Sequence, residues 1–179
     1  MKNQTRNLVL TGILSSLAVV FMIISITIPT FGHVIRWFSG AIILIILYET
    51  NIKTTIIASV TVTLISIIFI PNLFIPIDFI LLKGSYPIVR IFLNKINNKK
   101  IRMSIKSIYF MVYSGLSLYI SFVFFANPNI IRNIERFGYI FLLINFSLGI
   151  FYASWYDWFW LKYVDIWYKN KLKNILNRN

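Results

Sequence analysis

The hydrophobic positions of this chain form long blocks rather than the periodic stripes of amphipathic helices. A helix needs about 17 to 25 apolar residues to cross the hydrocarbon layer of a membrane. Helices are the expected form because backbone groups find no water in that layer and must bond internally. The pattern therefore predicts an all-α, polytopic membrane protein with six transmembrane helices in one bundle, over residues 8–28, 34–48, 54–70, 77–93, 107–126 and 139–161.

Polar segments and prolines separate these blocks. Pro29 ends the first span, and Pro71 and Pro76 bracket a loop or half-turn that continues neither neighbouring helix. We expect residues 1–179 to form a single transmembrane domain without a second folded domain. Its other features are a basic connector at 94–106, a loop or short surface helix at 127–138, an interfacial aromatic belt at 153–160 and a basic C-terminal tail at 162–179.

The charged residues indicate how the spans are oriented. Lys and Arg number 18 against 5 Asp and Glu, which gives a formal net charge of +13. In a soluble chain this excess would indicate a nucleic-acid partner, but cations also collect on the cytoplasmic side of membrane proteins. Thirteen cations fall in the two termini and the even-numbered connections, and three fall in the opposite loops. We therefore predict a multi-pass cell-membrane protein with cytoplasmic N- and C-termini, no nucleic-acid partner, and a tail that lies on anionic lipid.

The residue inventory gives no sign of catalysis. Its acidic residues are scattered, there is one histidine, His33, and cysteine is absent. No nucleophile motif, metal-ligand spacing or phosphate-binding loop occurs, so the sequence predicts no enzyme, no metal site and no cofactor. For the same reason the chain is not expected to be an ATPase by itself.

Two cations lie inside the fourth predicted span. Lys83 and Arg90 are two helical turns apart and share a face with Tyr86. Charged side chains in a span are costly and almost always face the bundle interior or a watery cavity. Pro87 removes the backbone hydrogen bond to the carbonyl of Lys83, and Gly84 loosens the same turn. A bent span lined by cations is typical of a transporter binding cavity.

Two interpretations of these cations stay open. In the first, Lys83 lines a cavity that opens outward and attracts an anionic small molecule. In the second, Lys83 pairs with Asp78, and Arg90 pairs with Asp157 or extends to the membrane surface. The sequence favours the second interpretation for Arg90 and does not separate the two for Lys83.

Polar residues also mark the last two spans. Ser114, Ser117 and Ser121 share one face of the fifth span, and Asn145 lies in the sixth. Such a face could bond a ligand, although hydrogen bonds to neighbouring helices are the more common use of these side chains in membranes. The candidate substrate-binding residues are therefore Lys83, Tyr86, Ser117 and Asn145.

The first span carries a motif of small residues. In the stretch TGILSSLAVV, Gly12 and Ser16 are four residues apart and remove bulk from one face, so another helix can approach closely. Ordinary packing inside this bundle would also account for them. The chain length, the six spans with both termini inside, and this motif together resemble the substrate-binding S subunits of energy-coupling factor (ECF) transporters. In that family the first-span motif, usually two alanines four apart, contacts the transmembrane coupling subunit, so the resemblance assigns this contact to Gly12 and Ser16.

The resemblance implies a non-enzymatic protein that binds a micronutrient, such as a vitamin, from outside the cell. Its partners would be the coupling subunit and separate ATPase subunits, which fits the absence of a nucleotide motif. Two other classes remain open, namely a scaffolding protein of the cell envelope and a membrane-embedded enzyme or lipid-handling protein. Cations inside a span count against the scaffold, and the missing acid–base pair counts against the enzyme.

Overall fold

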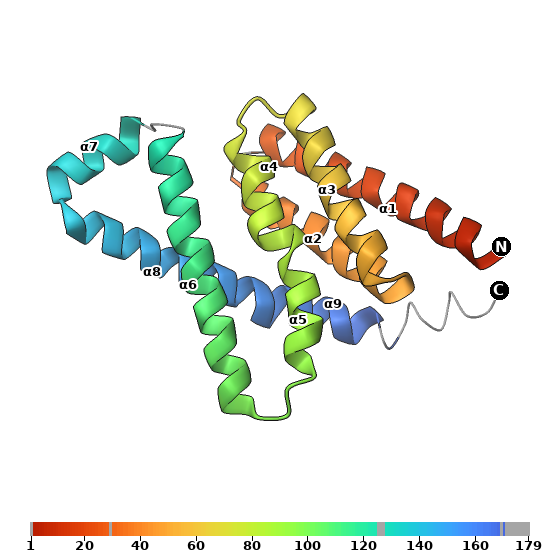
Figure 1. The fold of residues 1–179 in the computed structure, drawn as a ribbon. Helices are drawn as coiled ribbons and strands as arrows, with labels where there is room; N and C mark the ends of the chain where they lie inside the picture. The colour runs from red at the N-terminus through yellow and green to blue at the C-terminus, as the bar shows by residue number, and fades with distance from the viewer. Residues whose placement is uncertain (1, 29, 125–127, 169, 171–179) are drawn as a thin grey trace. The chain divides into compact units, whose positions relative to one another are not determined.

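The computed structural model describes residues 2–28, 30–124, 128–168 and 170. Within them the regular secondary structure is entirely helical (Figure 1). This confirms the predicted all-α class. The elements are α1 (Lys2–Thr27), α2 (Gly32–Glu49), α3 (Ile52–Phe69), α4 (Phe74–Asp78), η1 (Phe79–Gly84), α5 (Tyr86–Asn94), α6 (Lys99–Val123), α7 (Pro128–Phe137), α8 (Tyr139–Trp155), η2 (Tyr156–Leu161) and α9 (Lys162–Trp167), of which η1 and η2 are π-helical.

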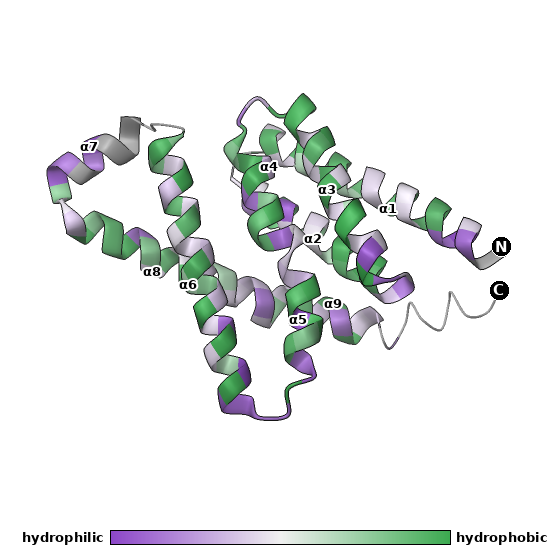
Figure 2. Cartoon of the chain, viewed as in Figure 1, coloured by the Kyte–Doolittle hydropathy of each residue, from purple (hydrophilic) through white to green (hydrophobic). Residues whose placement is uncertain are grey.

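Four stretches are long and apolar enough to cross a membrane. Three of them coincide with α1, α2 and α3, and the fourth joins α8, η2 and α9 into one continuous stretch. Hydrophobic residues dominate α3 and α8 along most of their length (Figure 2). Many large apolar side chains on these helices are exposed, as expected of surfaces that face lipid. The four stretches are Gln4–Thr27, Gly32–Glu49, Ile52–Phe69 and Tyr139–Trp167.

The helix starts follow local capping chemistry. The side-chain oxygen of Asn51 accepts a hydrogen bond from the backbone N–H of Thr54 at 2.9 Å and so caps α3. Asn98 does the same for α6, accepting from Lys100 at 3.0 Å. As a result α6 begins at Lys99, inside the segment that the sequence predicted to be a basic connector, and only the short stretch at 95–98 lies outside a helix.

The chain divides into two compact units. The first contains α1 to α4, η1, most of α5, η2 and α9, and ends its first segment at Ile91 before it resumes at Tyr156. The second contains α6, α7 and α8. Each unit has its own packing, and they are described separately below.

The core of the first unit lies between α1, α2 and α3. One face of α1 is buried at spacings of three and four residues, as in a coiled coil. Ala18 and Met22 on this face pack with Ile43 and Ile46 of α2 and Val62 of α3. The buried positions of the α1 face are Thr11, Ser15, Ala18, Val19, Met22 and Ser25.

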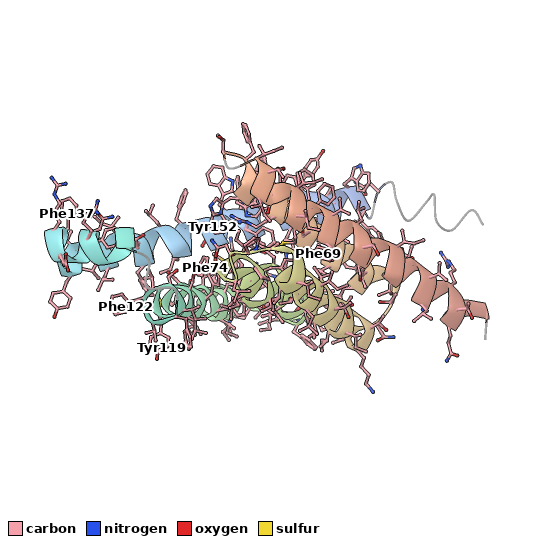
Figure 3. All side chains as sticks on the ribbon, turned by 90° about the horizontal axis from the view of Figure 1, so that it is seen from above. Phe69, Phe74, Tyr119, Phe122, Phe137 and Tyr152 are labelled. Carbon is pink, nitrogen blue, oxygen red and sulfur yellow. The ribbon has the colours of Figure 1, made fainter. Side chains whose placement is uncertain are left out.

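The second unit is built on the contact of α6 with α8. The hydroxyl of Ser114 donates a hydrogen bond to the carbonyl of Phe146 at 2.8 Å. Gly149 allows this approach, because a Cβ at that position would overlap the Ser114 hydroxyl. Ser114 therefore joins two helices, as favoured from the sequence, while Tyr119 and Phe122 project outward from α6 (Figure 3).

Candidate functional site

The segment that carries Lys83 is not one regular helix. Residues 79–84 form the π-helix η1, a turn at Ser85 follows, and α5 starts at Tyr86. The predicted break therefore occurs where Pro87 leaves the carbonyl of Lys83 without its usual helical donor. Pro76, in contrast, lies within α4 instead of ending a loop. It tolerates this place because the first turn of a helix needs no N–H partner.

Serine side chains satisfy carbonyls around this break. The hydroxyl of Ser59, on α3, donates to the carbonyl of Gly84 at 3.1 Å, and Ser85 donates to the carbonyl of Leu81 at 2.8 Å. Backbone groups freed in a membrane helix need such replacements because no water is present to satisfy them. Single π-helical turns often occur at functional sites, so this break is the natural place to look for one.

Lys83 forms a buried ion pair with Asp78. Its side chain is fully buried, and its Nζ atom lies 2.5 Å from Oδ2 of Asp78. The pairing considered from the sequence is thus present. Gly40 of α2 faces the same side chain, because a Cβ placed on Gly40 would lie only 3.1 Å from the Cβ of Lys83. The aliphatic part of Lys83 therefore rests against the backbone of α2.

Arg36 lies one helical turn before Gly40 on the same face of α2. It is 7% exposed, and its Nη2 atom lies 2.8 Å from Nδ1 of His33. His33 itself is exposed, and the charges of Asp78 and Lys83 act on it electrostatically. We name His33, Arg36, Asp78 and Lys83 the first charged cluster. Arg36 was not among the site residues predicted from the sequence. Its position four residues before Gly40, on the same helix face, was the signal that could have identified it.

A second charged cluster comprises Tyr48, Arg90, Asp157 and Asp165. Nε of Arg90 bonds to Oδ1 of Asp157 at 2.9 Å, which confirms the favoured interpretation of Arg90. Nη1 of Arg90 lies 3.7 Å from Oδ2 of Asp165. The hydroxyl of Tyr48 donates to the other oxygen of Asp165 at 2.6 Å. Four elements, α2, α5, η2 and α9, contribute to this cluster.

The two clusters carry opposite net charges. With His33 neutral, Arg36 and Lys83 against Asp78 leave one positive charge in the first cluster. In the second, Arg90 against two carboxylates leaves one negative charge. Since buried ionic groups need compensation, the first cluster is suited to an anion and the second to a cation.

Aromatic residues of η2 pack against α2. The indole N–H of Trp160 donates to the carbonyl of Trp37 at 3.0 Å, and the rings of Trp37 and Tyr156 lie 6.1 Å apart. Tyr156 is fully buried, whereas Trp158 is largely exposed. Part of the segment 153–160 is therefore buried, because η2 turns Tyr156 into the first unit, and the interfacial position of its exposed rings stays a prediction.

The other candidate substrate-binding residues divide between the units. Tyr86 is fully buried in the first unit, close in sequence to Lys83. Ser117 and Asn145 belong to the second unit, where the amide of Asn145 donates to the carbonyl of Phe141 in its own helix at 2.9 Å. Their participation in one site with Lys83 stays a prediction.

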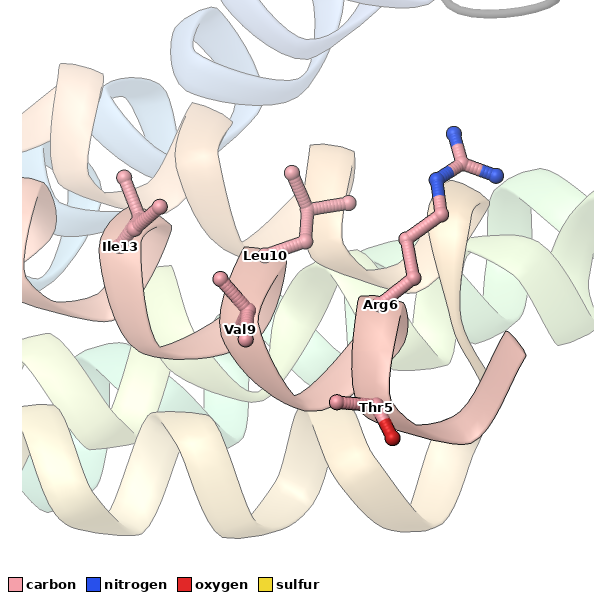
Figure 4. Close-up of a pocket in the computed structure, with 5 residues that line it drawn as sticks. All are labelled: Thr5, Arg6, Val9, Leu10 and Ile13. Carbon is pink, nitrogen blue, oxygen red and sulfur yellow. The ribbon is translucent and has the colours of Figure 1, made fainter. Parts of the chain in front are cut away.

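The small residues of the first span lie on the exposed face of α1. A Cβ on Gly12 would have no neighbour within 4 Å, and the hydroxyl of Ser16 donates to the carbonyl of Gly12 at 2.9 Å. Internal packing of the first unit thus does not use Gly12. A shallow pocket on this helix is lined by Thr5, Arg6, Val9, Leu10 and Ile13 (Figure 4).

Within the described residues, no group of three or more His, Cys, Asp or Glu side chains is placed to hold a metal ion. No protein-family model, curated protein or solved structure matches this chain. Its function must therefore follow from the residues and their geometry.

Proposed function

We propose that this chain is the membrane-embedded, substrate-binding subunit of an ECF-type transporter that takes up a vitamin-like micronutrient. The observation that carries the proposal is the fully buried Lys83, paired with Asp78 at the π-helical break of an apolar segment. Well-packed hydrophobic residues are often at least as stabilising as a buried ion pair, so stability alone gives little reason to keep one. Charges and broken helices within membrane segments are typical of transport sites.

The proposal includes the six-span topology. To the four stretches of sufficient length it adds a fourth span made of α4, η1 and α5 and a fifth span made of α6. The cation distribution then puts both termini in the cytoplasm and the α1–α2 connection outside. In this orientation the exposed His33 of the first charged cluster lies towards the side from which a nutrient arrives.

The coupling subunit is proposed to bind the exposed face of α1. Gly12 and Ser16 leave this face without bulk, and Leu8, Val9 and Ile13 beside them are apolar and exposed. A second membrane helix can approach such a surface closely. ATPase subunits, bound through that partner, supply the energy, and the chain itself is not an enzyme.

Uptake by charge variants tests the proposal. Lys83→Met and Asp78→Asn are each expected to abolish uptake, and the double variant is expected to remain inactive although its buried charge is balanced again. Lys53→Met, an exposed cation on α3, serves as the control and keeps full uptake. The wild-type chain should also purify together with ATPase subunits. Full uptake by the double variant would contradict a role of the pair in transport.

A scaffolding protein is the second candidate. The observation in its favour is that Lys83 and Arg90 both have carboxylate partners, which is how ion pairs would hold helices together. On this alternative, the double variant regains every property lost in the single variants, and no ATPase subunit purifies with the chain. The uptake experiment therefore separates the two candidates.

A further inference from the structure

We propose that the guanidinium group of Arg36 binds an oxyanion, a carboxylate or phosphate group carried by the ligand. The inference rests on the proposed function only in treating that ligand as the transported solute. It moves the binding contact from Lys83, whose charge Asp78 already neutralises, to a neighbouring cation on α2.

Arg36 is a buried cation without a carboxylate partner. Its side chain is more than nine-tenths buried, and no described Asp or Glu forms an ion pair with it. Its Nη2 atom bonds to His33, a neutral acceptor, and its Nε atom makes no hydrogen bond to any described residue. Arginine stays protonated in proteins, so this charge cannot be removed by losing a proton.

The neighbouring charges do not compensate Arg36. Asp78 is the carboxylate of the first charged cluster, and Lys83 lies against it. The cluster therefore keeps one positive charge in a low-dielectric setting, where an uncompensated buried charge strongly destabilises the fold. An anion at Arg36 would neutralise the cluster, so the folded chain and the anion favour each other.

The free donor of Arg36 also has the geometry for an oxyanion. Nε and Nη2 lie on one edge of the planar guanidinium, the edge that binds the two oxygens of a carboxylate or phosphate in parallel. Nη2 carries two hydrogens, so its bond to His33 leaves one of them available. Arg36 therefore retains its Nε–H and one Nη2 hydrogen for an oxyanion, while His33 accepts the other.

Arg36 lies near the N-terminal end of α2. His33 is exposed, whereas Arg36 three residues later is buried. The unpaired N–H groups at the N-terminus of α2, an 18-residue helix, add positive potential at the same end. The charge of Arg36 and the helix dipole therefore both favour an anion at this end of α2.

The test measures phosphate binding to the purified full-length chain in a neutral detergent at constant ionic strength. Inorganic phosphate should raise the thermal unfolding temperature of the wild type, and acetate should do so more weakly. In Arg36→Gln the affinity for phosphate should fall about 10- to 100-fold, the loss expected for hydrogen bonds to a charged group. Arg36→Lys should keep an intermediate affinity because it retains the charge but not the fork. Lys53→Gln, the matched exposed control, should bind as the wild type does.

Phosphate affinity that is equal in the wild type and Arg36→Gln would overturn the inference, as would an equal loss in Lys53→Gln. If Arg36→Gln does not give a monodisperse protein, Arg36→Lys takes its place. A phosphate affinity of Arg36→Lys equal to that of the wild type would then overturn the inference. Vesicles of neutral phosphatidylcholine, with or without phosphatidic acid, distinguish the source of the oxyanion. Phosphate binding in neutral vesicles supports a soluble ligand, and Arg36-dependent stabilisation by phosphatidic acid alone assigns the site to a lipid headgroup and overturns the solute assignment.

The experiments distinguish a failure of the oxyanion site from a failure of the proposed function. Loss of phosphate binding in Arg36→Gln, together with full uptake by the Asp78→Asn/Lys83→Met variant, would leave the oxyanion site in place and remove the transport role of the buried pair. Uptake that depends on Lys83, together with unchanged phosphate binding in Arg36→Gln, would support the transport role of the buried pair and overturn the oxyanion site at Arg36.

Discussion

The ammonium group of Lys83 lies 2.5 Å from the carboxylate of Asp78, with the lysine side chain fully buried at the end of a π-helix. Either partner alone would be an uncompensated buried charge. We expect Lys83→Met and Asp78→Asn each to destabilise the chain by about 3–5 kcal/mol and the double variant to recover most of that loss. Thermal unfolding in detergent measures all four proteins of this cycle, and strictly additive losses would show that the two charges do not interact.

In the second charged cluster, the carboxylates of Asp157 and Asp165 should contribute unequally to stability. Asp157 bonds to Arg90 at 2.9 Å, whereas Asp165 lies 3.7 Å from it and accepts from Tyr48. Asp157→Asn should therefore lower the unfolding temperature more than Asp165→Asn. Tyr48→Phe should remove about 1–3 kcal/mol, because it leaves one oxygen of Asp165 without this donor. Tyr163→Phe, at an exposed position of α9, is the control. Equal effects of the two tyrosine changes would contradict the described network.

Gly40 should tolerate no side chain. A methyl group there would overlap the hydroxyl of Tyr156 and press on Lys83, so Gly40→Ala should destabilise the chain by about 1–3 kcal/mol through overpacking. Adding Tyr156→Phe should relieve part of this loss. Gly12→Ala is the matched control, because its methyl group meets open space and helix propensity favours alanine by about 0.5–1 kcal/mol. A harmless Gly40→Ala variant would argue against close packing of α2 on η1 and η2.

The exposed face of α1 predicts an assembly phenotype. Gly12→Leu and Ser16→Leu should leave the chain inserted and monodisperse in detergent but reduce its co-purification with the coupling subunit. Ser15→Leu, on the buried face of the same helix, should instead disturb the fold itself. Loss of the monodisperse peak in Gly12→Leu would mean that this face is internal packing.

Much of the fold could be predicted because local chemistry determines it. Apolar blocks of span length identified the long helices, and Gly84 with Pro87 located the break before α5. The pairing of Arg90 with Asp157 was favoured because a buried charge near a membrane needs a partner.

Other features depend on contacts distant in sequence. Asp165 was assigned to a surface tail, but helical structure continues through η2 into α9 and brings it to Tyr48 and Arg90. Arg36, one of the three cations assigned to the opposite loops, is buried instead, and nothing in its sequence neighbourhood indicates this. The start of α6 was placed too late because a charged first turn hides the cap at Asn98.

The account centres on a small anionic molecule held at the first charged cluster. The most direct measurement is native mass spectrometry of the wild-type chain purified from its membrane, beside Arg36→Gln and the exposed control Lys53→Gln. We predict a retained non-lipid molecule with a carboxylate or phosphate group on the wild type and the control, and its loss from Arg36→Gln. A wild-type chain that carries no such molecule, or an Arg36→Gln variant that retains it fully, would contradict the account.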